Sequence, residues 1–405
     1  MINLLHIPEG VRDIYGSECI NKSKFENSVK EKLHSYGYQD VVTPTFEYFD
    51  IFNKERGTIR SRDMFKFFDK DGNTLVLRPD ITPQLARVAA KYYRESELPV
   101  RLCYRAKQYI NHSSLQGKLK ETTVLGAELY NDDSVAADFE MIALMTDSLL
   151  ACGLERFRIE IGITGFLEGI VEEAGLKEED VEELRELLLV KNIFGIEDFA
   201  ESRKMPAESK KVMSVIAELY GGAEVLETAA GFALNETSKA ALERLVKLNE
   251  MLEKFGYGKY VSYDLSMLSK YTYYTGIFFR GITTGVGEAI AYGGRYDRLV
   301  SQFGYDAPAI GMSVTLDYIM MGLDRRGELE TVPFVNLVFY SPDKEEEAIK
   351  TASELRSKGE AARLVRDNTG KLYESFIRKE DDSEVNRFIK ELEGFDVKNV
   401  IRIGE

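Results

Sequence analysis

The chain has 405 residues, which at a usual domain size of about 100–200 residues corresponds to two or three domains whose cores need neither disulfides nor metal. Its formal charge of −15, from 68 acidic and 53 basic residues, argues against a surface that binds nucleic acid or anionic membrane broadly. The three histidines and three cysteines lack C-x-x-C or H-x-x-x-H spacing, so the sequence predicts no metal centre and no cofactor.

Residues 1–10 contain a short apolar run without a basic region or a small-residue cleavage site, and no stretch approaches the roughly 20 apolar residues of a membrane span. Together with the unpaired cysteines, this predicts a cytoplasmic protein. Segments rich in β-branched and aromatic residues predict short strands on both sides of a central region. These strands are residues 40–44, 74–77, 100–104, 123–129, 157–163, 276–281 and 288–291.

The central region, residues 171–256, has its apolar residues almost wholly at helical spacing. Within it, residues 177–190 are acidic on one side and apolar on the other. A later helix is predicted to begin at a cap on Thr237 or Ser238 and to stop at Gly256. An all-helical module therefore interrupts a domain that is built on a sheet.

The tail alternates a strand at 334–340, a helix at about 344–358, a strand at 361–365, a further helix and a strand at 400–403. Such alternation is typical of a small α/β unit with parallel strands. The sequence therefore predicts an α+β protein in three parts. Residues 1–170 and 257–330 form the sheet domain, residues 171–256 form a helical insertion, and residues 331–405 form the C-terminal unit.

Residues 77–84 are the first cluster that could carry chemistry. Arg78 offers a cation, while Asp80 and Thr82 form an acceptor pair that could hold an ammonium group. The alternative is a strand end followed by a helix that Asp80 caps and whose first turn contains Pro83. Taken alone, the cluster fits this alternative better.

Residues 101–120 include no acidic residue and five basic ones. The basic residues are Arg101, Arg105, Lys107, Lys118 and Lys120. In an acidic chain, such a segment suits a carboxylate, a phosphate or an acidic partner surface, and a solvated hairpin explains it about equally well. The next predicted strand holds one carboxylate, Glu128, in an apolar run. A buried carboxylate needs a partner, such as a ligand cation or an imidazole, and this favours a binding site.

Two aromatic clusters follow. Residues 271–276, Tyr-Thr-Tyr-Tyr-Thr-Gly, place paired tyrosines beside a glycine, where a flat ring could lie against the backbone. A strand with aromatic cross-strand pairs is the alternative. Residues 292–297, Tyr-Gly-Gly-Arg-Tyr-Asp, put two glycines at a strand end, which indicates that a ligand or another strand approaches the backbone closely.

Further motifs lie at residues 8–13 (Pro-Glu-Gly-Val-Arg-Asp), 43–47 (Thr-Pro-Thr-Phe-Glu), 104–105 (Tyr-Arg) and 126–128 (Gly-Ala-Glu). With the clusters above, and in this order, they resemble the catalytic domain of histidyl-tRNA synthetase, a class II aminoacyl-tRNA synthetase. The similarity covers roughly residues 5–325. It implies an antiparallel sheet flanked by helices, with Pro44 of motif 1 in a homodimer interface.

Several positions depart from the pattern of that family. The glutamate that contacts adenine falls at Lys107, and the motif 3 arginine falls at Tyr318. The arginine and aspartate before the tyrosine pair fall at Ser269 and Thr272. Because loss of one such arginine commonly costs orders of magnitude in rate, we infer that the chain does not adenylate histidine.

The histidine pocket that the resemblance implies matches the family pattern more closely than the nucleotide site does. Val124 replaces its glutamine, but the remaining pocket residues match. These candidate ligand-binding residues are Asp80, Thr82, Arg105, Glu128, Tyr273 and Tyr274.

A synthetase-like chain that keeps an amino-acid site and loses its nucleotide site is similar to the regulatory subunits of ATP phosphoribosyltransferase, the first enzyme of histidine biosynthesis. Residues 78–84, Arg-Pro-Asp-Ile-Thr-Pro-Gln, resemble the motif of that family. The resemblance implies that residues 331–405 are a truncated, acidic form of the anticodon-binding domain that a synthetase needs in full. It also implies a non-catalytic, allosteric subunit that activates a short catalytic subunit in a hetero-oligomer, with L-histidine as effector and neither tRNA nor membrane as partner. The acidic tail residues include Glu345, Glu346, Glu347, Asp381 and Asp382.

Histidine closing the pocket is expected to reorder the basic loop 107–120, whose Lys107, Lys118 and Lys120 are candidate contacts for an anion or the partner. The nearby Arg60, Arg62 and Lys66 could change their contacts with the partner in the same way. Three alternatives stay open: a divergent but active histidyl-tRNA synthetase, a stand-alone histidine-sensing or tRNA-binding protein, and a structural homodimer without a ligand.

Overall fold

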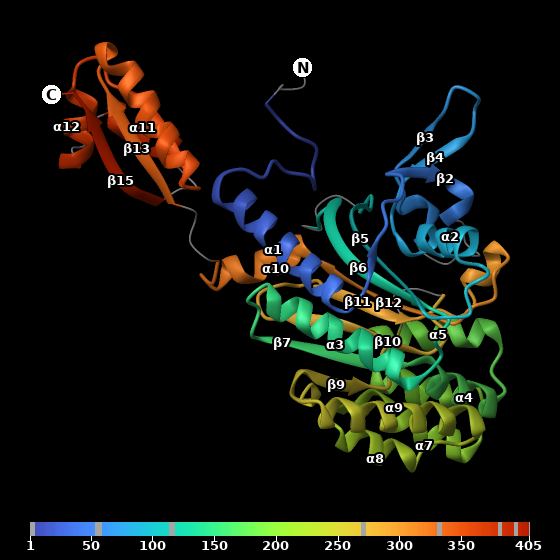
Figure 1. Cartoon of the computed structure of the whole chain (residues 1–405). Coiled ribbons are helices and arrows are strands. Elements are labelled where there is room, and N and C mark those ends of the chain that lie inside the picture. The colour runs from blue at the N-terminus through green and yellow to red at the C-terminus, as the bar shows by residue number, and fades with distance from the viewer. Residues whose placement is uncertain are drawn as a thin grey trace. The chain divides into compact units, whose positions relative to one another are not determined.

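The computed structural model describes residues 5–52, 59–112, 118–268, 273–329, 334–379, 383–392 and 396–404. The chain divides into two compact units, Met1–Arg12 with Phe25–Arg326 and Asp13–Lys24 with Gly327–Glu405. Figure 1 shows the large sheet in the first unit and the C-terminal strands in the second. No helix in these described parts combines the length and apolar character that crossing a bilayer requires.

A mainly antiparallel sheet forms the centre of the first unit (Figure 1). Over the described residues it has nine strands in the order β1-β5-β6-β12-β11-β10-β7-β9-β8, of which the pairs β1–β5 and β7–β9 are parallel. This sheet confirms the predicted α+β fold class. The strands are β1 (Gln39–Asp40), β5 (Val100–Tyr109), β6 (Glu121–Tyr130), β7 (Phe157–Ile163), β8 (Tyr220–Gly221), β9 (Val261–Asp264), β10 (Ile277–Thr283), β11 (Ala291–Arg295) and β12 (Ala309–Thr315).

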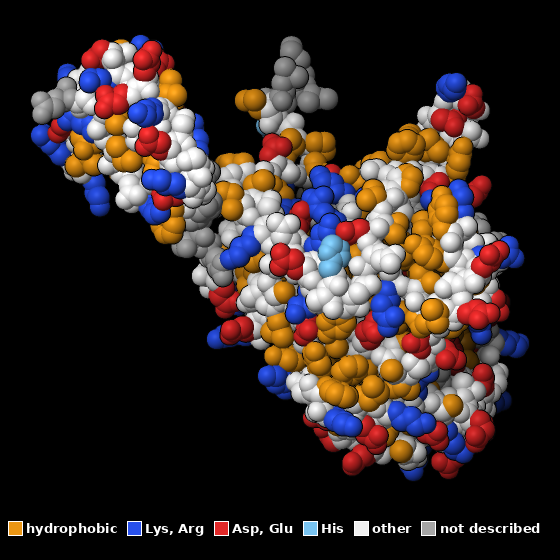
Figure 2. Space-filling view, viewed as in Figure 1, with side chains coloured by type: hydrophobic (Ala, Val, Ile, Leu, Met, Phe, Trp, Pro, Cys, Tyr) orange, Lys and Arg blue, Asp and Glu red, His pale blue; other side chains and the backbone are white. Residues whose placement is uncertain are grey.

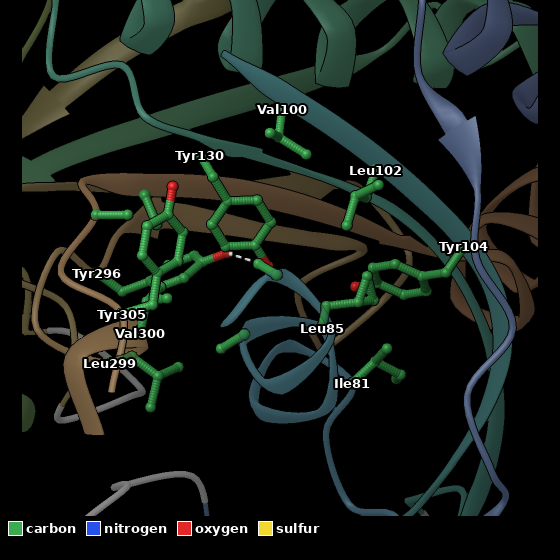
Figure 3. Packing of buried hydrophobic residues seen from close by; sticks show 14 of the residues in the cluster. Ile81, Leu85, Val100, Leu102, Tyr104, Tyr130, Tyr296, Leu299, Val300 and Tyr305 are labelled. Carbon is green, nitrogen blue, oxygen red and sulfur yellow. Dashed lines mark hydrogen bonds between the residues drawn. The ribbon is translucent and has the colours of Figure 1, made fainter. Parts of the chain in front are cut away.

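The two faces of the sheet differ because side chains alternate along each strand. Leu102 and Tyr104 of β5 point into a buried cluster with residues of helix α2 (Thr82–Tyr92). Figure 3 shows Ile81 and Leu85 beside the Tyr104 ring in this cluster. On the opposite face lie α3 (Val135–Ala151) and the end of α1 (Gly16–Ser35), and Arg101 of β5 pairs there with Glu140 of α3 at 2.8 Å.

Six helices lie between β7 and β9 in the described chain, where the sequence predicts a helical insertion. The predicted cap at Thr237 or Ser238 is wrong, because the Asn235 side chain accepts the Ser238 N–H at 3.1 Å and α9 begins at Glu236. The short strand β8, which pairs with β9, also interrupts the helices. The helices are α4 (Thr164–Ala174), α5 (Glu178–Leu189), α6 (Ile193–Ser202), α7 (Ala207–Val215), α8 (Glu224–Ala230) and α9 (Glu236–Lys254).

A second, three-stranded sheet in the first unit has the order β2-β4-β3. Its strands are antiparallel, with bounds β2 (Phe46–Tyr48), β3 (Lys66–Phe68) and β4 (Thr74–Leu77). The Phe46 and Phe67 rings pack edge to face, with 5.9 Å between centroids. Both rings remain exposed, as do those of Tyr48 and Phe68. Figure 2 shows apolar side chains gathered over this region.

The C-terminal unit contains the predicted parallel strands. β13 (Phe334–Tyr340) lies between β14 (Ala362–Arg366) and β15 (Asp396–Ile403), and it is parallel to both. Phe339 of β13 packs on aromatic residues of the helices, such as Phe388. The helices are α11 (Glu345–Ser357), α12 (Lys371–Arg378) and α13 (Ser383–Glu391). Residues 381 and 382 of the predicted acidic tail lie outside the described residues.

Candidate functional site

A hollow on the α2 side of the sheet brings together side chains from the 80–82 turn, β5, β6, β11, β12 and the tyrosine pair. It encloses about 280 Å³, counting its open mouth. Five of the six predicted histidine-site residues line it; Arg105 does not. The lining residues are Asp80, Thr82, Tyr104, Glu128, Tyr273, Tyr274, Tyr292, Gly293, Tyr296, Gly311, Met312 and Ser313.

Glu128 is the buried acid at the base of this hollow. The Thr82 hydroxyl donates to its Oε1 at 2.9 Å, and the Tyr296 hydroxyl donates to its Oε2. Burial raises the pKa of the Glu128 carboxyl to about 8, although the two donors act to lower it and the nearby Asp80 acts to raise it. At neutral pH, this group can therefore either donate or accept a hydrogen bond. Tyr296 was not among the predicted site residues, although it belongs to the quoted motif at 292–297.

Asp80 lies just before α2 and lines the hollow. Its Oδ1 accepts the backbone N–H groups of Ile81 at 2.7 Å and Thr82 at 3.3 Å, just before α2. Its Oδ2 accepts the Tyr273 hydroxyl at 3.1 Å, and the side chain is buried at the edge of the hollow. Asp80 therefore bonds to the backbone just before α2, although the N-cap residue is Ile81 and not Asp80, and its second carboxylate oxygen faces Tyr273 at the edge of the hollow.

The tyrosine pair forms an aromatic wall of the hollow. The Tyr273 ring packs edge to face on Tyr274, with 5.1 Å between centroids, and on Tyr296, at 5.8 Å. Tyr274 stacks on Phe278 of β10. A Cβ added to Gly294 would lie 2.8 Å from the Tyr274 ring, so this position needs a glycine for the ring to lie against the strand. The neighbouring Tyr271 and Thr272 lie outside the described residues.

The predicted close approach to the glycine pair is confirmed, but its place in the strand is not. The sequence predicted a strand at 288–291 that ends at the glycines, whereas Gly293 and Gly294 lie inside β11. Gly311 of β12 lies opposite Glu128 of β6, and a Cβ there would overlap the Glu128 carboxylate. Gly311 lies seven residues before Tyr318, which occupies the motif 3 arginine position, and nothing else in the sequence indicated its place beside Glu128.

Arg105 is not brought to the hollow. It follows Tyr104 on β5, so its side chain lies on the opposite face of the sheet, and it pairs there with Glu26 of α1 at 2.6 Å. Arg105, which was predicted to bind histidine, therefore lies outside the hollow that the other five predicted residues line. The neighbouring Lys107 pairs with Glu121 of β6.

Two further arginines singled out in the sequence have structural partners. Arg78 is buried and donates to the carbonyl oxygens of Thr43 at 2.9 Å, Pro44 at 3.2 Å and Lys107 at 2.7 Å. It fixes the motif 1 turn and is not among the residues that line the hollow. Arg295 is buried against Asp138 of α3, with its Nη2 2.7 Å from the carboxylate.

A second, larger hollow adjoins the first. It encloses about 750 Å³ with its open mouth and shares Asp80, Tyr104, Tyr292 and Ser313 with the first hollow. Lys118 and Lys120 both line the second hollow, and so do His112, Val124, Glu288 and Tyr318.

The charged groups of this second hollow are partly neutralised within it. Lys118 pairs with Glu288 at 2.8 Å. Burial and the nearby Glu288 carboxylate raise the pKa of the Tyr318 hydroxyl to about 12, so Tyr318 brings a neutral ring to the position of the motif 3 arginine. Ser269, a further departure from the family pattern, and residues 113–117 of the basic loop lie outside the described residues.

The sheet, its helices and the hollow define a class II synthetase-like protein of the histidyl-tRNA synthetase type. Residues 10–319 match the family model described as histidyl-tRNA synthetase. A solved histidyl-tRNA synthetase from Nostoc sp. PCC 7120 has a TM-score of 0.76 over 93% of this chain and 90% of its own; at 19% identity, it supports the fold alone.

Relatives of higher identity define the family more narrowly. Two curated proteins named ATP phosphoribosyltransferase regulatory subunit are similar to this chain. The one from Acetivibrio thermocellus is 38% identical over 89% of this chain and 86% of its own length. The one from Clostridium acetobutylicum is 37% identical over 90% of each.

A solved structure agrees with these relatives. The structure from Bacillus halodurans, described as an ATP phosphoribosyltransferase regulatory subunit/histidyl-tRNA synthetase, covers 100% of both chains with a TM-score of 0.84 and 31% identity. The chain belongs to the family of ATP phosphoribosyltransferase regulatory subunits.

Proposed function

We propose that this chain binds L-histidine in the hollow around Glu128 and, as a non-catalytic subunit, conveys that binding to the short catalytic subunit of ATP phosphoribosyltransferase. It would activate the catalytic subunit when histidine is scarce and inhibit it when histidine is abundant. The observation that carries the proposal is that two buried carboxyl groups, Asp80 and Glu128, lie in one hollow with an aromatic wall.

The α-ammonium group of histidine suits Asp80. A cation held by a buried carboxylate gains a charge-assisted hydrogen bond, and Asp80 Oδ2 already accepts one hydrogen bond from Tyr273 on this side. The Thr82 hydroxyl, now bonded to Glu128, can turn toward the same group. A ligand without an ammonium group would leave Asp80 a desolvated carboxylate without a cation.

The imidazole suits Glu128 and the tyrosines. A carboxyl group whose pKa is about 8 can donate to a basic ring nitrogen or accept from a ring N–H, so it recognises neutral imidazole in either tautomer. The Tyr273 and Tyr274 rings offer a flat, apolar surface beside it. An aliphatic side chain would leave the buried Glu128 without a new partner, which favours histidine over leucine or methionine.

The adjoining hollow gives little support to nucleotide chemistry. A triphosphate needs cations that are free to neutralise it, whereas Lys118 already pairs with Glu288. The Glu288 carboxylate would repel phosphate, and the neutral Tyr318 adds no charge. These contacts support a regulatory rather than an adenylating role.

The two strands that hold the pocket also offer a route to a partner surface. β5 and β6 carry Tyr104 and Glu128 in the pocket, and the segment that joins them carries Lys118 and Lys120 beside the second hollow. Histidine that draws Asp80 and Glu128 together would move this segment relative to a bound catalytic subunit. A coupling free energy of about 1–3 kcal/mol would change affinity about 5- to 150-fold.

The exposed aromatic face of the β2-β4-β3 sheet supports a homodimer within the larger hetero-oligomer. Phe46 and Tyr48 follow the motif 1 turn directly, and each is more than half exposed. Exposed apolar patches of this kind commonly mark protein interfaces. The charged Arg60, Arg62 and Lys66 lie in the neighbouring chain segment and would border such an interface.

Reconstitution with the short catalytic subunit tests the proposal. The wild-type chain is expected to activate phosphoribosyl transfer from phosphoribosyl pyrophosphate to ATP, and L-histidine is expected to reverse the activation. Glu128→Gln should still activate but respond less to histidine, whereas Glu186→Gln, which changes an exposed glutamate on α5, should behave as wild type. No activation by the wild-type chain, or histidine-dependent pyrophosphate exchange by the chain alone, would contradict the proposal.

A further inference from the structure

Three potential metal ligands converge where α1 ends at the edge of the large sheet. His34 Nε2 lies 3.0 Å from Asp40 Oδ2, and Cys103 Sγ lies 3.7 Å from Asp40 Oδ1. One ligand atom from each residue lies within 4.8 Å of the other two. His34 and Asp40 are exposed, whereas Cys103 is buried beneath them.

The backbone fixes the spacing of these side chains. Asp40 on β1 and Cys103 on β5 are direct partners in the parallel ladder, so their side chains point to the same face. His34 lies in the last turn of α1, and the turn that follows is closed by Gly37, whose φ is +84° and whose N–H donates to the His34 carbonyl oxygen at 2.9 Å. A short helix–turn–strand segment and one strand pair therefore preorganise all three ligands.

We propose that His34, Asp40 and Cys103 bind a zinc-class divalent cation, with water as the fourth ligand. An imidazole, a carboxylate and a thiolate are the ligand types that zinc takes, and tetrahedral zinc has bonds of about 2.0–2.3 Å to them. Ligand atoms around such an ion lie roughly 3–4 Å apart, which is close to the separations already present. The mixed nitrogen, oxygen and sulfur set disfavours magnesium and calcium, which prefer oxygen alone.

Binding requires two changes within the cluster. The Cys103 thiol must lose its proton to solvent as the sulfur–metal bond forms, and burial raises the pKa of that thiol to about 12 while no metal is bound. Lys30 of α1 must also turn away, since its Nζ lies 3.0 Å from the same Asp40 Oδ2. The Lys30 ammonium group thus occupies the position beside Asp40 that the metal ion would take, so removing this group should strengthen metal binding.

The site is independent of the histidine pocket. Cys103 and Tyr104 are neighbours on β5, so their side chains lie on opposite faces of the sheet. Spacing could not reveal the cluster, because Cys103 lies far along the sequence from His34 and Asp40. The expectation of no metal centre was based on that spacing alone.

Cobalt(II) titration of the purified full-length chain, after treatment with a chelator, tests the proposal. We expect one cobalt per chain, with tetrahedral d–d bands and a thiolate-to-cobalt charge-transfer band. Zinc should displace the cobalt. His34→Gln and Asp40→Asn, which alter exposed side chains, should each weaken cobalt binding by more than about 100-fold. Loss of a residue that only hydrogen-bonds to a metal ligand costs roughly 10- to 100-fold, and loss of a ligand itself should cost more.

Matched variants decide which thiol is involved. Cys103→Ser should abolish the charge-transfer band, Cys19→Ser, at an exposed cysteine, should leave it unchanged, and Lys30→Met should tighten binding. Absence of the band in the wild-type chain would overturn the proposal. So would a band that survives in Cys103→Ser, or affinities unchanged in both His34→Gln and Asp40→Asn.

Discussion

Gly311→Ala should weaken histidine binding without removing any side chain from the pocket. The added Cβ would overlap Glu128 Oε2 and lie 3.0 Å from the Ala127 carbonyl oxygen, and Gly311 is held in the middle of β12 between β6 and β11. The backbone cannot yield easily there, so the Glu128 carboxyl must move away from Thr82 or Tyr296. A bound imidazole would then lose a correctly placed hydrogen bond to a charged or strongly polar group, worth about 1.5–3 kcal/mol.

Isothermal titration of L-histidine into the purified variant measures this loss. The stated free energy corresponds to about 10- to 150-fold weaker binding. Overpacking should also lower the free energy of unfolding by about 1–3 kcal/mol, which urea denaturation would detect. Gly287→Ala is the matched control, since a Cβ at that exposed glycine meets no atom within 4 Å. Histidine binding by Gly311→Ala as tight as that of the wild type would refute the assignment of Glu128 to the ligand.

Three further predictions concern the charged groups of the fold. The pKa of Glu128 is raised in the folded chain, so its stabilising contribution is complete below its unfolded pKa of about 4.5 and is lost as the pH rises through about 8. The unfolding free energy of the wild type, measured by urea denaturation, should therefore fall between pH 5 and pH 8 relative to that of Glu128→Gln. A difference that does not change with pH would contradict the raised pKa. The buried Asp138 carboxylate pairs with Arg295 at 2.7 Å and with Arg244 of α9 at 2.6 Å. Arg295→Ala removes one of these two cations and should cost about 3–5 kcal/mol of unfolding free energy, whereas a loss below about 1 kcal/mol would show that Arg244 alone is a sufficient partner. Arg105→Ala should leave the histidine dissociation constant unchanged by calorimetry, because its partner is Glu26 on the other face, and a tenfold loss would restore Arg105 to the pocket.

Much of the fold follows from local pattern. Residues 157–163 and 334–340 form strands with the predicted limits, because their β-branched and aromatic residues lie in buried strand centres. By contrast, β12 at residues 309–315 was not predicted, since its glycine and methionine content gives little strand signal. Residues 40–44 form only the short β1, because the Thr43 and Pro44 carbonyl oxygens bond to Arg78 instead of a strand.

The pocket residues, too, could be predicted from the sequence only in part. Glu128 stood out in the sequence as the one carboxylate in an apolar strand, and the structure confirms that its side chain is buried. The face that each residue presents could not be known before the strand register, and this explains why Arg105 was misplaced and Tyr296 overlooked. The cluster of His34, Asp40 and Cys103 depends wholly on the pairing of β1 with β5, which no local pattern encodes.

The most direct test of the central claim is to titrate L-histidine and ATP separately into the purified wild-type chain by calorimetry. We expect saturable histidine binding at one site per chain, loss of that binding in Glu128→Ala, and no binding of ATP at comparable concentrations. Absence of histidine binding, or ATP binding as tight as that of histidine, would contradict the view that this family member keeps the amino-acid site of a synthetase and has lost its nucleotide site.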